Sequence, residues 1–270
     1  FRMIQKIAAQ IRSLIGRHRP ETAIILGSGL GALADEITDS VSISYADIDG
    51  FPQSTVQGHG GKLIIGQLKD KEILCMQGRF HLYEGHKPQV INTVIKAFQL
   101  LGIKNLIVTN AAGSLNPEFA PGSLMLIKDH INFSGTNPLI GPNDDRYGPR
   151  FPGMADAYTA EWRHKIKELA AERNIPLNEG VYLWALGPCF ETAAEIKMFQ
   201  LLGGDAVGMS TVPEVICAAH SGMKVLGISV ITNYGTGMNH SMPSHEETLR
   251  EGQKAAADLT ALIKAFIGEL

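Results

Sequence analysis

The sequence contains no uninterrupted apolar stretch long enough to cross a membrane. A transmembrane helix needs roughly 20 consecutive, mostly apolar residues. The first residues, FRMIQK, carry basic side chains and lead into an amphipathic pattern, whereas the core of a secretory signal is apolar throughout. We therefore expect no contact with a membrane and no signal peptide.

Cysteine is scarce as well. The 270 residues include 3 cysteines, Cys75, Cys189 and Cys217, and no two of them form a C-x-x-C pair. Disulfide frameworks of small secreted domains use an even number of cysteines, and zinc sites use closely spaced pairs. We therefore expect neither a disulfide nor a metal site, and a reducing, cytoplasmic environment is the simplest interpretation.

The chain also lacks a basic cluster, a linker and a repeat. Its 24 Lys and Arg residues and 27 Asp and Glu residues give a net charge of −3 that is spread along the sequence. Proteins that bind nucleic acids neutralise backbone phosphates with grouped Lys and Arg side chains, so we expect no nucleic-acid partner. Because no Pro/Gly/Ser-rich boundary divides the chain, residues 1–270 are predicted to form a single domain.

What the sequence does contain is an alternation of helical and extended patterns. Helices are predicted over residues 4–15, 88–101, 158–173, 191–202 and 211–220 and from about residue 244. Strands are predicted over residues 22–26, 105–109, 180–186, 205–207 and 224–231, with a hairpin formed by residues 62–68 and 72–76. Strands that are apolar on both faces and alternate with helices indicate an α/β fold, with a mixed, mostly parallel central sheet flanked by helices. Such sheets bind ligands where their strands end.

The first such turn, GSGLGA at residues 27–32, follows the first predicted strand. Its glycines would let backbone N–H groups approach an anion, and a helix predicted to follow would add a favourable dipole. The same pattern suits a dinucleotide fold, in which Asp47 stands at the distance expected of the residue that holds the ribose. A tight turn without any ligand is a third interpretation.

Residues 78–83, GRFHLY, follow the hairpin and place Arg79, His81 and Tyr83 at alternate positions. In an extended segment these side chains would share one face. The arginine fork suits phosphate oxygens, and a histidine can donate a further hydrogen bond. A structural ion pair or a core contact would explain each of the three residues equally well.

Later turns carry side chains that could bind a planar base or an anion. Phe190 can stack on a planar base and Glu191 can accept hydrogen bonds from ring N–H groups, although Glu191 would also suit the first turn of a helix. Ser210 follows a strand and would either bind phosphate or cap the next helix. Asn233 ends a buried strand, where its amide can both donate and accept.

The order of these segments is more specific than any one of them. GSGLG, GHGG, GRFHLYEG, TNAAGSLNP, KDHIN, GPNDDRYGPRFP, GPCFET, VGMSTVPEV, ITN and SHEE follow one another along the chain. In this order they closely resemble the trimeric class of purine nucleoside phosphorylases, from about residue 4 to the last helix. The resemblance argues against the dinucleotide interpretation of residues 27–32, because a dehydrogenase would need none of the later segments.

The resemblance implies an enzyme that cleaves purine nucleosides with inorganic phosphate and releases the base and ribose 1-phosphate. Its implied phosphate-binding residues are Ser28, His59, Arg79, His81, Ser210 and, through its backbone N–H, Ala111. The implied ribose contacts are Tyr83, Met209 and His245, with Phe151 reaching in from a neighbouring subunit. The implied base contacts are Phe190, Glu191 and Asn233. His240 is an alternative to His245.

The resemblance also implies how the reaction proceeds. Asn233 would bind N7 as negative charge builds on the base, Glu191 would hold N1–H, and His81 would help to bind the attacking phosphate. Asparagine at position 233 resembles the enzymes that prefer 6-oxopurines, so inosine and guanosine are expected substrates, with xanthosine as a third candidate. A homotrimer that acts in purine salvage, uses phosphate as a co-substrate and needs no metal or organic cofactor is expected.

Three competing functions are distinguishable by simple assays. A dehydrogenase would change nicotinamide absorbance, a non-catalytic nucleoside-binding protein would release no base, and a hydrolytic nucleosidase would release base without phosphate. Ala185, Leu186 and Tyr234 stand at positions that vary among relatives, so they do not rank the substrates.

Overall fold

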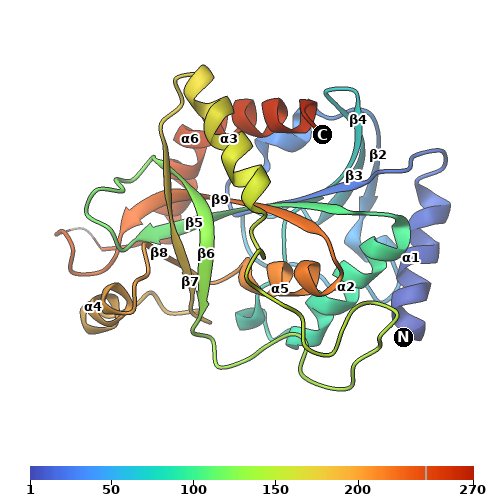
Figure 1. Cartoon of the computed structure of the whole chain (residues 1–270), viewed down its shortest axis with the longest axis horizontal. Helices are drawn as coiled ribbons and strands as arrows, with labels where there is room; N and C mark the ends of the chain where they lie inside the picture. Colours follow the sequence, from blue (N-terminus) through green and yellow to red (C-terminus); the bar gives the residue numbers. More distant parts are fainter. Residues whose placement is uncertain (241) are drawn as a thin grey trace.

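The computed structural model describes residues 1–240 and 242–270 and shows a central sheet with helices on both faces (Figure 1). Within these residues, nine strands form one sheet in the order β2-β3-β4-β1-β5-β8-β7-β6-β9, with β9 also pairing with β5. The strands are β1 (Thr22–Leu26), β2 (Thr38–Ser44), β3 (Lys62–Leu68), β4 (Lys71–Gln77), β5 (Asn105–Ser114), β6 (Leu124–Asn132), β7 (Leu177–Trp184), β8 (Ala206–Gly208) and β9 (Lys224–Tyr234).

The helices cover the two faces of this sheet. They are α1 (Arg2–Leu14), α2 (Pro88–Leu101), α3 (Ala160–Glu172), α4 (Ala193–Leu201), α5 (Val212–His220) and α6 (His245–Gly268). α3 and α6 lie on one face, and α2 and α5 lie on the other (Figure 1). None of the helices in the described part of the chain is long and apolar enough to span a membrane.

The buried strands are apolar on both faces because each face has its own core. In β1, Ala23 and Ile25 pack in the cluster with α1, α2 and α5, whereas Ile24 and Leu26 pack in the cluster with α3 and α6. β1 pairs in parallel with β4 and β5, β5 pairs in parallel with β9, and β7 pairs in parallel with β6 and β8. The remaining pairings are antiparallel. The α/β prediction with a mixed sheet is therefore confirmed.

The strands β2 and β6 were not predicted from the sequence. β2 reads TDSVSIS, and only one of its residues is buried, since it is an edge strand that pairs with β3 alone. β6 begins apolar and buried but ends in the polar sequence KDHIN. Its first residues pair with both β9 and β7, whereas its later residues pair with β7 alone. β2 has no continuous apolar run, and the run in β6 is limited to its first four residues, LMLI.

The helix predicted after residues 27–32 is wrong. A short 3₁₀ helix, η1 (Gly31–Glu36), follows instead, so no α-helix dipole faces this turn. Close packing and backbone conformation explain the glycines of this turn. A Cβ at Gly27 would lie 2.7 Å from Cα of Asn110, and Gly29 adopts φ of +72°. The turn needs glycine in order to pack against β5 and to reverse direction.

β5 and β9 are both longer than predicted. They pair in parallel from Asn105 opposite Lys224 to Ser114 opposite Tyr234, with a shift in register after Ala112. This extension carries Asn110 and Asn233 past the apolar part of the sheet. The polar ends of the two strands therefore lie side by side and line one cavity.

Candidate active site

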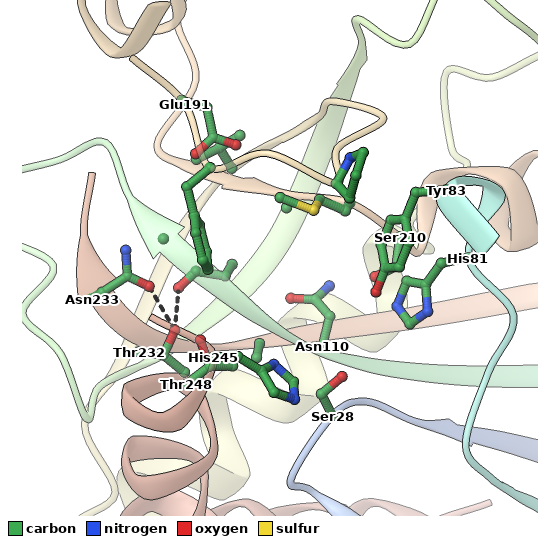
Figure 2. A pocket seen from close by; sticks show the side chains of 18 of the residues that line it. Ser28, His81, Tyr83, Asn110, Glu191, Ser210, Thr232, Asn233, His245 and Thr248 are labelled. Carbon is green, nitrogen blue, oxygen red and sulfur yellow. Dashed lines mark hydrogen bonds between the residues drawn. The ribbon is translucent and has the colours of Figure 1, made fainter. Parts of the chain in front are cut away.

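A cavity of about 280 Å³ lies at the carboxyl ends of β1, β5, β8 and β9 (Figure 2). This volume is close to the lower end of the range for small-molecule sites, roughly 300–1,000 Å³. Of the predicted site residues, those that line it are Ser28, Arg79, His81, Tyr83, Ala111, Phe190, Glu191, Met209, Ser210, Asn233 and His245. His59 and Phe151 are not among the lining residues. The strands therefore bring segments that are far apart in sequence to one place.

Arg79 is a buried cation with only 1% of its surface exposed. Its Nε donates to Oε1 of Glu214 at 3.1 Å, and its Nη1 donates to the carbonyl oxygen of Thr109 at 2.6 Å and to Oγ of Ser210 at 3.2 Å. A buried charge is tolerated when it is paired and hydrogen-bonded. These contacts hold the guanidinium in one orientation at the cavity wall, where it can attract an anion.

Ser28 reaches the cavity with His59 behind it. The backbone N–H of Arg79 donates to Nδ1 of His59 at 3.1 Å, so Nδ1 must be unprotonated. Nε2 of the neutral ring then carries the hydrogen and donates to Oγ of Ser28 at 2.9 Å. Burial, with the nearby His81 and Arg79, lowers the pKa of His59 to about 3, so the ring is neutral at physiological pH. The hydroxyl hydrogen of Ser28 is left to donate to a ligand.

His81 is fixed by the 3₁₀ turn η3 (Leu82–Glu84). Its backbone N–H donates to Oε2 of Glu84 at 2.7 Å, and its Nδ1 lies 3.4 Å from the same oxygen. The ring stacks on Tyr83 with centroids 4.7 Å apart. Burial lowers the pKa of His81 and outweighs the opposing influence of Glu84, so a neutral ring faces the cavity. Tyr83 reaches the cavity through this turn and not through the extended face that the alternate spacing predicts.

Asn233 occupies the other side of the cavity (Figure 2). Oγ1 of Thr232 donates to Oδ1 of Asn233 at 2.9 Å, and Nδ2 of Asn233 donates to the carbonyl oxygen of Tyr234 at 3.0 Å. These two bonds fix the amide and leave one N–H of Nδ2 to donate. A Cβ at Gly113 would lie 3.2 Å from Nδ2, so glycine makes room for the amide.

Glu191 and Phe190 lie on the same side as Asn233. Burial raises the pKa of Glu191, although a backbone hydrogen bond opposes the shift. Phe190 is 42% exposed and stands at the cavity wall with one part of its surface open. An aromatic face, a carboxylate and an amide thus converge where a planar heterocycle could bind.

Tyr83, Met209 and His245 also line the cavity, and Tyr83 lies on the same side as His81 (Figure 2). Burial raises the pKa of Tyr83 to about 12, so its hydroxyl keeps its hydrogen and can donate. His245 is the first residue of α6, and its Nε2 lies 3.3 Å from the carbonyl oxygen of Gln57. His240 is exposed and does not line the cavity, which favours His245 over the alternative.

Some residues at the site were missed in the sequence. Asn110 lines the cavity although it lies within a buried strand, and a polar residue in such a strand is a signal that could have identified it. Thr232 and Thr248 also line the cavity, and Glu214 pairs with Arg79 from α5. Asp47 is exposed and does not line the cavity, so the acidic residue that a dinucleotide site needs is not in place.

Comparison with known proteins places this geometry in context. The family described as Phosphorylase superfamily matches residues 21–268. Purine nucleoside phosphorylase 1 of Geobacillus stearothermophilus is 50% identical over 248 residues, which are 92% of this chain and 90% of that protein. Purine nucleoside phosphorylase 1 of Bacillus subtilis is 47% identical over 266 residues, 98% of each protein.

Solved structures agree with this comparison. A crystal structure of Schistosoma mansoni purine nucleoside phosphorylase in complex with adenosine superposes with a TM-score of 0.95 at 39% identity, covering 100% of this chain and 98% of that one. Structures of Schistosoma purine nucleoside phosphorylase also contain inosine or guanosine.

Proposed function

Because the chain belongs to the phosphorylase superfamily and is an enzyme of the purine nucleoside phosphorylase type, we propose that it prefers 6-oxopurine nucleosides. Inosine and guanosine, with their deoxy forms, are the proposed substrates, and xanthosine is a third candidate. Phosphate is the proposed co-substrate, and the products are the free base and ribose 1-phosphate or its deoxy form. The released base is available for reuse, which gives the enzyme a role in purine salvage.

The arrangement of Glu191 and Asn233 carries the proposed preference. A 6-oxopurine presents N1–H, a donor that a carboxylate can accept, whereas N1 of a 6-aminopurine is an acceptor that a carboxylate repels. Asn233 keeps one N–H free to donate, which suits the acceptors N7 and O6 of a 6-oxopurine. The related Schistosoma enzyme binds adenosine, a 6-aminopurine nucleoside. The preference is therefore measured as a ratio of kcat/KM values and not as binding alone.

The opposite side of the cavity supports phosphate as the second substrate. Arg79 supplies a buried positive charge, and the hydroxyls of Ser28 and Ser210 supply donors. Ala111 adds its backbone at the same wall. Charged acceptors gain most from donors that are fixed in advance in a site of low dielectric.

Cleavage of the glycosidic bond leaves positive charge on the ribose and negative charge on the base. Phosphate bound beside Arg79 would stabilise the ribose cation and then attack the anomeric carbon. The electrons of the glycosidic bond would pass to the purine, which takes up the proton that hydrogen phosphate gives up and leaves as the neutral base. Asn233 would stabilise the negative charge at N7, while Glu191 keeps the base in place. No metal or organic cofactor enters this scheme, because phosphate and nucleoside supply both reacting groups.

The proposed assembly is a homotrimer in which Phe151 closes the site of a neighbouring subunit. Phe151 is 88% exposed, and it lines a groove on its own subunit that is separate from the cavity. A phenylalanine that is this exposed is suited to a contact outside its own subunit. We place the trimer in the cytoplasm, since Cys75, Cys189 and Cys217 are all free thiols.

The test measures release of base from inosine, guanosine and adenosine, with and without inorganic phosphate, and follows ribose 1-phosphate in parallel. We expect release that depends on phosphate, one ribose 1-phosphate per base, and a higher kcat/KM for inosine than for adenosine. Release without phosphate would identify a nucleosidase, and binding without release would identify a nucleoside-binding protein. Equal kcat/KM for inosine and adenosine would refute the 6-oxopurine preference alone.

A further inference from the structure

Thr211 has an unusual backbone at the edge of the phosphate side of the cavity. Its φ and ψ are +72° and −53°, and the N–H of Val212 donates to the carbonyl oxygen of Ser210 at 2.8 Å. This is a three-residue γ-turn with positive φ, a rare and strained conformation. For a β-branched residue it is a true outlier, and such strain is found mainly where the surrounding structure requires it.

The strained turn places the hydroxyl of Thr211 between Asn110 and Ser210. A glycine would adopt this φ without strain, whereas threonine adds a hydroxyl that is fully buried. Nδ2 of Asn110 donates to Oγ1 of Thr211 at 2.9 Å, and Oγ of Ser210 lies 3.0 Å from the same atom. Among the described residues, these are the hydrogen-bond partners of the Thr211 hydroxyl.

The directions of these bonds follow from counting donors. Since Oγ1 of Thr211 accepts from Asn110, its own hydrogen has one neighbour left to which it can donate, Oγ of Ser210. Oγ of Ser210 also accepts from Nη1 of Arg79 at 3.2 Å. Both lone pairs of the Ser210 oxygen are then occupied. Its hydrogen can only be donated, and Ser210 lines the cavity.

We infer that Thr211 is a positioning residue that turns Ser210 into a dedicated hydrogen-bond donor for phosphate. The inference rests on the proposed function, since it assigns phosphate to the side of the cavity that Ser210 lines. The relay from Asn110 through Thr211 to Ser210 parallels the pair in which His59 donates to Ser28. In both cases a donor behind the serine occupies its oxygen, so the hydroxyl offers its hydrogen to an anion. Donors linked in series also polarise one another.

The experiment compares Thr211→Val, which keeps the shape and loses the hydroxyl, with Thr211→Ser, which keeps the hydroxyl. Thr211→Val loses the hydrogen bond that holds Ser210 as a donor to the charged ligand, which should raise the KM for phosphate by about 5- to 20-fold. The KM for inosine should stay within about twofold, and Thr211→Ser should be close to the wild type, because it restores the donor that acts on Ser210. Equal changes in both KM values would refute the inference.

A matched substitution acts on the other side of the cavity. Thr232→Val removes a hydroxyl that is equally buried and that donates to Asn233. It should raise the KM for inosine and leave the KM for phosphate within about twofold, the reverse of Thr211→Val. If both variants raise the same KM, the hydroxyls act through general packing and the inference is wrong.

Two further measurements keep the test independent of turnover. Inorganic phosphate alone should raise the melting temperature of the wild type, and Thr211→Val should need about 5- to 20-fold more phosphate for the same shift. In a double-mutant cycle, Thr211→Val should weaken phosphate binding in the wild type but cause no further loss in Ser210→Ala. Additive losses would mean that Thr211 does not act through Ser210. If the wild type binds phosphate but releases base in the absence of phosphate, the proposed function is wrong. The inference that Thr211 acts through Ser210 on bound phosphate would still hold.

Discussion

At the scale of single residues, Asn233 is the side chain on which the proposed mechanism depends most. Its amide is held by Thr232 and by the carbonyl oxygen of Tyr234. Asn233→Ala removes the donor proposed for N7, and loss of one donor aimed at developing charge lowers turnover by about 10²- to 10³-fold. We expect this loss in kcat/KM for inosine by steady-state kinetics. Asn178→Ala, on β7 and away from the cavity, is the matched control.

Replacing Asn233 by aspartate tests recognition of the base separately from catalysis. A carboxylate can accept a hydrogen bond from a 6-amino group but repels O6 of a 6-oxopurine. We therefore expect the ratio of kcat/KM for adenosine to that for inosine to rise by about tenfold or more in Asn233→Asp. An unchanged ratio, in a variant that still binds phosphate, would remove Asn233 from base recognition.

His59 predicts a specific dependence of stability on pH. Its pKa is about 3 in the folded protein and about 6.5 when unfolded, so the unfolded chain binds the extra proton between these values. The stability contributed by the neutral ring is complete above pH 6.5 and is lost as the pH falls toward 3. Between pH 7 and 5 this loss amounts to about 2 kcal/mol in the free energy of unfolding.

His59→Gln should remove this contribution, because glutamine does not titrate. Urea unfolding measures the free energy of unfolding at pH 7 and at pH 5. The fall in this free energy from pH 7 to pH 5 should be smaller in His59→Gln than in the wild type by about 2 kcal/mol. His164→Gln changes a histidine whose side chain is 78% exposed and should leave the difference unaltered. The same pH dependence in all three proteins would contradict a buried, neutral His59.

The sequence identified most residues of the site but not how they are arranged. Arg79 and His81 were predicted from alternate spacing in an extended segment, and both line the cavity. Asn110 and Thr211 were missed for physical reasons. Asn110 lies one position beyond the strand predicted over residues 105–109, so it was not assigned to a buried strand, and the positive φ of Thr211 is imposed by tertiary structure against the preference of threonine. His59 matched a motif, and only the structure places it behind Ser28.

At the scale of elements, local pattern determined which segments are helices and strands, whereas tertiary pairing determined their ends. α2 begins and ends as predicted, since Pro88 occupies the first turn and Gly102 ends it with φ of +100°. β5 continues to Ser114 because β9 pairs with it there. No local signal in the sequence TNAAGS indicates this extension, and it is the extension that places polar residues in the cavity.

The turn before Phe190 contains Gly187, which packs against Met209 in the cavity wall. Gly187 adopts φ of +71°, and a Cβ at this residue would overlap Sδ of Met209. Gly187→Ala should therefore lower the free energy of unfolding by about 1–2 kcal/mol and, by displacing Met209, raise the KM for inosine. Thermal unfolding and steady-state kinetics measure the two effects.

Gly102→Ala provides the matched comparison for Gly187→Ala. Gly102 has a φ of +100°, and a Cβ there would meet nothing within 4 Å. This variant should lose a similar amount of stability, about 1–2 kcal/mol, with an unchanged KM for inosine. If both variants raise that KM, the loss reflects general destabilisation and not the contact between residue 187 and Met209.

At the scale of the whole molecule, the cavity of one subunit is built without Phe151. In a trimer with cyclic symmetry, one surface of each subunit meets a different surface of the next, so each site would receive Phe151 from one neighbour. Phe151→Ala should lower kcat/KM for inosine by about tenfold or more, which is the effect expected when a large apolar contact is lost. Light scattering coupled to size-exclusion chromatography tests the proposed trimer.

Mixed trimers test whether Phe151 serves its own site or its neighbour's. Phe151→Ala and Asn233→Ala subunits, carrying different tags, are co-expressed and purified through both tags. In a mixed trimer, a subunit that keeps Asn233 is complete when the neighbour that reaches it keeps Phe151. Every closed ring of three that contains both subunit types has one position that meets this condition, so about one site in three is complete in the purified mixed trimers. We therefore expect activity well above that of either parent. If Phe151 acted within its own subunit, every subunit would carry one defect, and the mixture would show the average of the two parents.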